Sequence, residues 1–192
     1  MKRLFSMQCF LAVLAATFLL LFTAGAADPK EGAWGGVLDM RTTSLILPPQ
    51  PSCASLPLTV ECRVKLLGSG AYNILIANEA KDSSTHWELF TTPGDGVLHL
   101  YAPGRRPDHC HTQLGIVDKQ WHWITAILEE SRFQIYVDGV KKGDTSVSIA
   151  QHDSKSGNLA IGSLAEGGVF CNGVMDELRI SQGVRDWEKI EN

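Results

Sequence analysis

The chain of 192 residues carries 17 lysines and arginines against 21 aspartates and glutamates, a formal net charge of −4 at pH 7. The basic residues are scattered, so the sequence lacks the basic footprint of a nucleic-acid-binding protein. Its length fits one domain with a core of its own.

The N-terminus has the features of a secretory signal peptide. Two basic residues precede an apolar run over residues 10–22, and small residues at 24–26 offer a cleavage site. We therefore expect residues 1–26 to be removed and residues 27–192 to form a mature domain that is secreted, periplasmic or at the cell surface. A retained membrane anchor is the alternative, because the apolar run approaches the roughly 17 residues of a minimal span.

The cysteines of the expected mature chain predict disulfides. These four residues are Cys53, Cys62, Cys110 and Cys171. An even number in an exported chain favours disulfides, and four cysteines allow three pairings. We favour Cys62 with Cys171 and Cys53 with Cys110. A buried thiol is the alternative for Cys62, which alternates with apolar residues on an expected core face.

Short strands follow one another along the chain. A broken strand pair is expected over residues 38–47 and a clear strand over residues 58–67, where apolar and polar residues alternate. Residues 72–77 predict another strand. Residues 86–92 and 97–101 predict a hairpin, because a Pro-Gly-Asp-Gly turn separates them.

The second half of the chain continues this pattern. Residues 102–118 are expected to be the longest irregular stretch, and residues 121–139 predict two strands closed by Asp138 and Gly139, which favour a tight turn. Further strands are expected at 146–149, 158–163 and 173–181. About ten short strands with almost no helical periodicity predict an all-β, two-sheet antiparallel jelly-roll sandwich.

Three separated stretches resemble the laminin G-like, concanavalin A-like lectin/glucanase superfamily. They are Leu-Pro-Leu-Thr-Val-Glu-Cys-Arg-Val-Lys at 56–65, Trp-His-Trp-Ile at 121–124 with Ile-Tyr-Val-Asp-Gly at 135–139, and Leu-Ala-Ile-Gly at 159–162 with Asn-Gly-Val-Met-Asp-Glu-Leu-Arg-Ile at 172–180. The His-Trp-Glu and Ala-Pro-Gly stretches at 86–88 and 102–104 resemble the domains of exported bacterial, planctomycete-type proteins. The resemblance implies a jelly roll whose concave sheet often holds glycans.

Several residues are candidates for binding. Trp87 and Tyr101 are the better candidates for an exposed aromatic platform, and the stretch over residues 102–118 carries Arg105, Arg106 and His109. Arg63 stands where many relatives carry a tryptophan, and an arginine there would bind carboxylate or sulfate groups. The alternative is an exposed arginine that pairs with Glu61 or another acid.

The sequence also bears on catalysis and metal binding. The Glu-x-Asp-x-x-Glu motif of laminarinase-type relatives is absent, so we expect no catalytic residues. Relatives often hold a structural calcium, and Asp176 with Asn172 could bind one through oxygen ligands; otherwise Asp176 caps a turn or pairs with Arg179. A zinc site at residues 109–111 is disfavoured, because neighbours in an extended loop point apart and no second pair of ligands is evident.

These observations predict an exported, non-catalytic binding module for carbohydrate or a glycosylated surface. A protein-interaction or adhesion domain is the alternative, and a polysaccharide hydrolase or lyase is a third. We expect no nucleic-acid partner, no required cofactor, and membrane contact only through an uncleaved signal.

Overall fold

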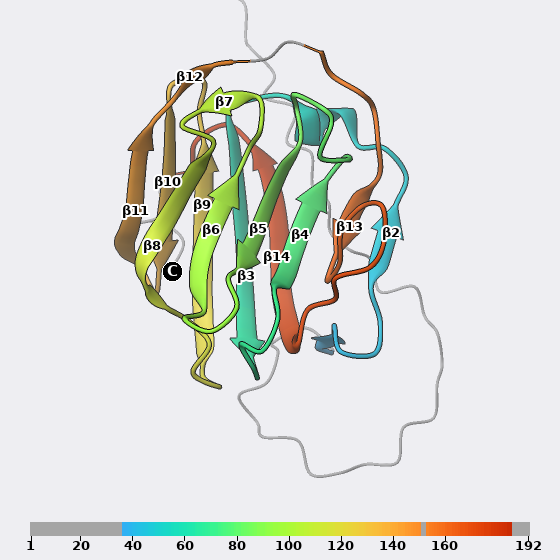
Figure 1. Ribbon diagram of the computed structural model, residues 1–192, viewed down its shortest axis with the longest axis vertical. Coiled ribbons are helices and arrows are strands. Elements are labelled where there is room, and N and C mark those ends of the chain that lie inside the picture. Colours follow the sequence, from blue (N-terminus) through green and yellow to red (C-terminus); the bar gives the residue numbers. More distant parts are fainter. Residues whose placement is uncertain (1–35, 151–152, 186–192) are drawn as a thin grey trace, which may run out of the picture.

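The computed structural model describes residues 36–150 and 153–185, which form two antiparallel sheets (Figure 1). The expected signal peptide lies outside the described residues. Sheet A has six strands in the spatial order β1 (Leu38–Asp39), β14 (Gly173–Gln182), β3 (Leu58–Leu66), β9 (Trp121–Leu128), β10 (Arg132–Val137) and β11 (Val140–Ser146). Sheet B has six in the order β2 (Leu45–Leu47), β13 (Leu159–Ile161), β4 (Asn73–Asn78), β5 (Trp87–Thr91), β6 (Val97–Tyr101) and β8 (His109–Gly115).

Two small elements complete the fold. Strands β7 (Arg105–Arg106) and β12 (Ser148–Ile149) form a two-stranded ribbon, and the 3-10 helix η1 spans Pro51–Ala54. The predicted all-β sandwich is confirmed. No helix among the described residues is long and apolar enough to cross a membrane.

The inner faces of the two sheets enclose one apolar core. Alternation along β3 buries Val60, Cys62 and Val64, and β10 buries Phe133 and Ile135 in the same way. Sheet B contributes leucines from β5 and β6 to the same cluster. Burying each large aliphatic or aromatic side chain contributes about 1.5–3 kcal/mol, so this core is the main source of stability.

The hairpin predicted over residues 121–139 lies at the centre of sheet A. Strand β9 pairs with β3 on one side and with β10 on the other. Asp138 and Gly139 have φ angles of 50° and 73° and form the two-residue turn into β11, as predicted from an Asp-Gly pair. The Asp138 carboxylate accepts a hydrogen bond from the backbone N–H of Trp123 at 2.8 Å, which fixes the turn to β9.

The prediction of an irregular stretch over residues 102–118 is wrong. It contains β7 and β8, and β8 is the edge strand of sheet B, where it pairs with β6. The inward residues of β8 are Cys110 and Thr112, both buried. Because these are not strongly apolar and the outward residues include two histidines, the hydrophobic alternation that marks a strand is weak in this stretch.

The outer face of sheet A is partly covered by the chain that follows β14. Thr59 donates a hydrogen bond to the Gly183 carbonyl at 2.8 Å, and the Arg185 guanidinium lies 2.6 Å from the Glu61 carboxylate. Both β3 side chains are consequently buried, although they lie on the face of the sheet opposite the core. Burial raises the pKa of Glu61 above its ordinary value, although Arg185 and Arg179 act against it.

The four cysteines are buried thiols, and no disulfide joins any of them in the part of the chain that the structure describes. The predicted pairs, Cys62 with Cys171 and Cys53 with Cys110, are therefore wrong. The alternative for Cys62, a thiol buried on the core face of β3, is the observed state. Burial raises the pKa of Cys62 and of Cys171 to about 12, so neither thiol ionises near neutral pH.

Candidate functional site

The outer face of sheet B carries side chains in two rows that cross four strands. The register places Ile74, Phe90, His99 and His111 opposite one another in the first row, and Ala77, Glu88, Tyr101 and His109 in the second. Directly opposed residues on adjacent strands have Cβ atoms about 4.5–5.5 Å apart, so their rings touch. The stacked rings of Phe90 and His99, with centroids 5.1 Å apart and planes at 14°, show this contact.

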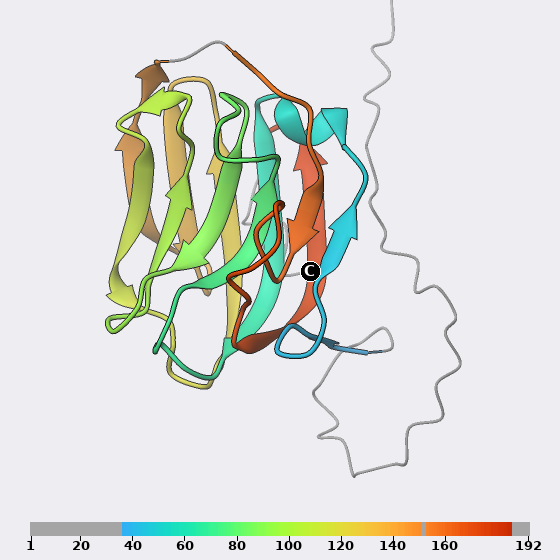
Figure 2. The same ribbon diagram turned by 45° about the vertical axis from the view of Figure 1, so that its right-hand side comes forward.

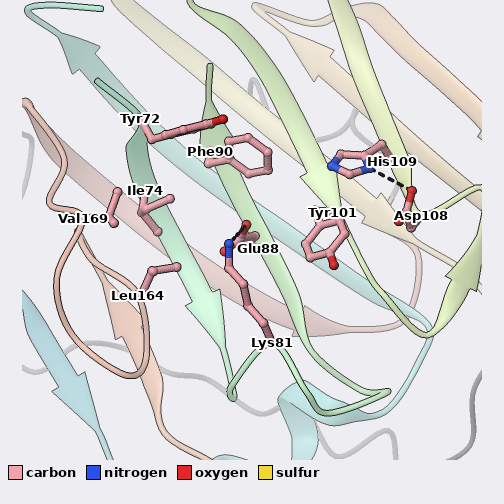
Figure 3. Close-up of a pocket in the computed structure, with 10 residues that line it drawn as sticks. All are labelled: Tyr72, Ile74, Lys81, Glu88, Phe90, Tyr101, Asp108, His109, Leu164 and Val169. Carbon is pink, nitrogen blue, oxygen red and sulfur yellow. Dashed lines mark hydrogen bonds and ion pairs between the residues drawn. The ribbon is translucent and has the colours of Figure 1, made fainter. Parts of the chain in front are cut away.

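A pocket of about 470 Å³ opens over this face (Figure 3). Strand residues form its floor, and loop residues close its sides. Its lining consists of Tyr72, Ile74, Lys81, Glu88, Phe90, Tyr101, Asp108, His109, Leu164 and Val169.

One side of the pocket is apolar. Tyr72 and Phe90 lie against each other with ring centroids 5.8 Å apart. Leu164 packs against the cluster of Ile74, Ala77 and Phe90 from the connection between β13 and β14, which lies over the outer side of sheet B (Figure 2). Val169 extends this side from the same connection. The apolar side therefore combines strand and loop residues that are far apart in the sequence.

The other side of the pocket is charged and aromatic. The Lys81 ammonium lies 3.1 Å from the Glu88 carboxylate, and the His109 Nδ1–H donates to Asp108 at 2.9 Å. The Tyr101 ring lies between these pairs, 4.6 Å from the His109 ring centroid and 5.8 Å from the Lys81 Nζ. Figure 3 shows the Lys81–Glu88 ion pair and the His109–Asp108 hydrogen bond on either side of this ring.

Both carboxyl groups of the pocket are held in the ionised form. Burial opposes ionisation of Glu88, but His86, whose Nε2 lies 3.7 Å away, and the Lys81 charge outweigh burial and lower the pKa of Glu88. The hydrogen bond from His109 lowers the pKa of Asp108. Burial, followed by the charge of Asp108, raises the pKa of Tyr101, so its hydroxyl stays protonated near neutral pH. The pocket thus offers fixed acceptors and donors beside aromatic faces.

Among the residues that the sequence predicted for binding, the structure brings Tyr101 and His109 together in this pocket. The expectation that Trp87 is an exposed platform is wrong. Trp87 is only 2% exposed, and its Nε1–H donates to the Cys53 carbonyl at 2.7 Å. Because Leu89 also points into the core, alternation along β5 turns Trp87 inward and Glu88 outward.

The predicted arginines lie away from the pocket floor. Arg63 lies on the outer face of sheet A, with its guanidinium 4.9 Å from the Trp121 ring centroid. Glu61, one of the acids expected to pair with Arg63, pairs with Arg185. In the β7 ribbon, the Arg105 side chain binds Glu130 at 2.7 Å, whereas Arg106 is exposed and lies 3.7 Å from Asp108 at the pocket edge.

The predicted calcium ligands lie at the start of β14. The Asp176 Oδ1 accepts the Glu177 N–H at 2.9 Å, and its buried Oδ2 has no hydrogen-bond partner. The Asn172 N–H donates to Asn73 at 2.8 Å. In the described parts of the chain, no group of three or more histidine, cysteine or acidic side chains could hold a metal ion. Calcium at Asp176 and Asn172 stays a prediction.

Sequence reasoning missed most of the pocket. Tyr72 and Phe90 were not selected, although strands over residues 72–77 and 86–92 were expected. The signal for Phe90 was present, because it alternates with Leu89 and must face away from the core. Lys81 and Val169 gave no comparable signal, since loop residues reach the pocket only through the tertiary fold.

Several solved structures are similar to this chain. The binding domain of botulinum neurotoxin DC in complex with SialylT has a TM-score of 0.57 at 10% identity, covering 77% of this chain and 37% of that one. Mouse laminin alpha1 domains LG4-5 have a TM-score of 0.54 at 16% identity, covering 82% of this chain and 46% of that one. A third similar structure is domain 4 of AbnA, an arabinanase from Geobacillus stearothermophilus, in complex with arabinotriose. It has a TM-score of 0.52 at 19% identity, covering 73% of this chain and 66% of that one.

At these identities the likeness to solved structures shows the fold alone, and the chain spans less than half the length of the neurotoxin and laminin chains. No curated protein sequence matches the chain. A family model described as the concanavalin A-like lectin/glucanases superfamily matches residues 39–191, which includes nearly all of both sheets. The chain therefore belongs to the concanavalin A-like lectin/glucanases superfamily.

Proposed function

We propose that the pocket on sheet B binds a saccharide and that the protein is an exported, non-catalytic carbohydrate-binding module. The observation that carries the proposal is the pairing of an aromatic side with a side of ionised, hydrogen-bonding groups in one pocket of about 470 Å³. A sugar ring presents C–H groups on its faces and hydroxyl groups on its edge. Pockets of this size with a few placed polar groups are typical of small-ligand sites.

The individual contacts suit such a ligand. Tyr72 is exposed and Tyr101 partly exposed, and both offer aromatic faces, while Asp108 offers carboxylate oxygens to hydroxyl donors. The buried Glu88 carboxylate holds the Lys81 ammonium in place. The Lys81 ammonium can donate to a hydroxyl oxygen from the same side. The sugars named with two similar structures, SialylT and arabinotriose, support a saccharide as the ligand class.

The state of the two carboxyl groups supports the absence of catalysis. Glycoside hydrolysis needs a carboxylic acid whose pKa is raised so that it can protonate the leaving group. Glu88 and Asp108 instead have lowered pKa values, because each is paired with a positively charged or hydrogen-bonding partner. Neither residue is therefore suited to act as the general acid.

A glycan array followed by calorimetry with the best saccharide tests the proposal. Tyr101→Ala and Tyr72→Ala should each weaken binding about tenfold, since one aromatic contact contributes roughly 1.5 kcal/mol. Arg63→Ala, on the outer face of sheet A, is the matched control and should bind like the wild type. Failure of every saccharide to bind, or equal binding by all variants, would overturn the proposal.

A further inference from the structure

The pocket on sheet B has an aliphatic corner, formed by Ile74, Leu164 and Val169. Figure 3 shows these three side chains grouped together, on the side of the pocket away from His109 and Asp108. None of the three carries a polar side-chain atom. A saccharide has hydroxyl groups around its ring edge, and a hydroxyl against the corner would lose its bonds to water without gaining a partner. The corner therefore suits a different, apolar group on the ligand.

The aliphatic corner and its surroundings expose apolar surface to water. Val169 is 44% exposed, and Phe170, the next residue in the chain, is 59% exposed. Tyr72, which lines the same pocket, is also exposed. Single exposed apolar side chains are normal on soluble proteins, whereas several at one site mark a binding surface. A ligand group that covered this surface would remove it from water, which favours binding.

The backbone that presents Val169 is strained. Its φ angle of 44° lies in the left-handed region that β-branched residues rarely adopt. It follows Gly167 and Gly168, whose φ angles are 85° and 70°. Because Val169 is exposed, burial of its side chain within the protein offsets little of the strain. Strained residues of this kind cluster at functional sites, which points to a ligand contact at Val169.

Hydrogen bonds fix the loop that carries Val169. The Cys171 N–H donates to the Gly162 carbonyl at 3.0 Å and so closes the connection between β13 and β14. The Lys81 backbone N–H donates to the Glu166 carboxylate at 3.1 Å. This second bond ties the loop to the residue whose ammonium lines the polar side of the pocket. The aliphatic corner and the polar side are thus held together in advance, which lowers the cost of binding a ligand that contacts both.

We propose that the ligand of the pocket is a glycolipid, in which the saccharide is joined to a hydrocarbon chain that lies in the aliphatic corner. The inference rests on the proposed saccharide site and names the class of saccharide that it binds. The sugar contacts Tyr101, Asp108 and Lys81, and the chain covers Val169 at the rim. Each methylene group that is buried in this way strengthens binding roughly fourfold.

Calorimetry with alkyl glycosides tests the inference. The methyl, hexyl and octyl β-glycosides of glucose, galactose and N-acetylglucosamine are titrated into the full chain, below the concentrations at which they form micelles. In the sugar series that binds best, the hexyl glycoside should bind at least tenfold more tightly than the methyl glycoside, because burial of about two methylene groups gives this ratio.

Equal affinities within every series, or no binding by any of these glycosides, would overturn the inference. Saccharide binding on a glycan array is a separate result. An array that shows binding while chain length has no effect would leave the proposed saccharide site in place and overturn only the hydrocarbon chain.

Val169→Asn should reduce the hexyl-to-methyl affinity ratio at least threefold. Asparagine adopts positive φ angles more readily than valine, so the Tm should not fall and the reduced ratio would not come from unfolding. Leu164→Ala removes a second side chain of the corner and should reduce the ratio as well. Val140→Asn is the matched control, because it makes the same substitution at an exposed valine on β11 of sheet A. An unchanged ratio in both corner variants, or an equal loss in Val140→Asn, would contradict the inference.

Vesicles of phosphatidylcholine without any sugar distinguish a glycolipid site from a general lipid surface. The protein should not sediment with these vesicles, because the chain is expected to bind only as part of a glycolipid whose sugar occupies the polar side. Binding to sugar-free vesicles that Val169→Asn abolishes would overturn the inference, since the corner would then bind lipid without a saccharide.

Discussion

Replacing Trp87 with phenylalanine should destabilise the protein and leave saccharide binding unchanged. Trp87 is 2% exposed, and its Nε1–H bonds to the Cys53 carbonyl at 2.7 Å, which ties η1 to sheet B. Leaving that buried carbonyl without a donor costs about 1–3 kcal/mol. The smaller ring adds roughly 1 kcal/mol for lost contacts and cavity volume. The free energy of unfolding should fall by about 2–4 kcal/mol in total, which lowers the Tm by roughly 5–15 °C.

Urea unfolding followed by circular dichroism measures this loss, and calorimetry measures saccharide affinity on the same preparations. Trp121→Phe is the matched control, because Trp121 is half-buried on the outer face of sheet A under Arg63. Trp121→Phe should lower the free energy of unfolding by less than about 1 kcal/mol. The reasoning is refuted if Trp87→Phe unfolds like the wild type. It is also refuted if a folded Trp87→Phe variant loses saccharide binding, since Trp87 would then reach the ligand.

Three further predictions concern charge and sulfur. Burial opposes charging of His122, but Asp138 and Asp118, at 2.7 and 3.1 Å, outweigh it and raise the pKa of His122. The stabilisation of the folded protein by these pairs is fully present below the unfolded-state pKa of about 6.5 and is lost as pH rises through the folded-state pKa. The free energy of unfolding in urea should therefore exceed that of His122→Asn by an amount that shrinks between pH 6 and 9. A constant difference would contradict this. Arg185→Ala leaves Glu61 buried without its main partner, so it should lower the free energy of unfolding by about 3 kcal/mol at pH 7. The deficit should be smaller at pH 4.5, where the raised pKa of Glu61 favours its neutral form, and an equal deficit at both pH values would speak against this pairing. Iodoacetamide without reductant should leave Cys53, Cys62, Cys110 and Cys171 unmodified in the folded protein and label all four in urea, as intact mass can show; protection in urea would reveal disulfides.

The strands of this fold could be predicted because their residues alternate and their turns carry glycine, proline and aspartate. The hairpin of β9 and β10 is the clearest case, since apolar residues mark both strands and Asp138 with Gly139 marks the next turn. Strand β8 could not be predicted in this way, because its inward residues are Cys110 and Thr112. Local alternation reveals a strand only when its buried face is clearly apolar.

The pocket was less predictable, because its residues meet through strand order and register. Tyr101 and His109 were selected from the sequence, yet nothing local indicates that β6 pairs with both β5 and β8. The wrong expectation for Trp87 had a local cause instead, because alternation with Leu89 already turns Trp87 toward the core. The lack of register information did lead to the wrong cysteine pairs, since an even number of cysteines indicates disulfides without showing which side chains come close.

The most direct test of the pocket as a saccharide site is nuclear magnetic resonance of the protein titrated with the saccharide that binds best on a glycan array. Perturbed signals should be confined to the outer face of sheet B and its loops, with Tyr72, Tyr101 and His109 among the most affected. The signals of Arg63 and Trp121 on sheet A should stay in place. Perturbation centred on Arg63 and Trp121, with Tyr101 unaffected, would contradict the assignment of the site.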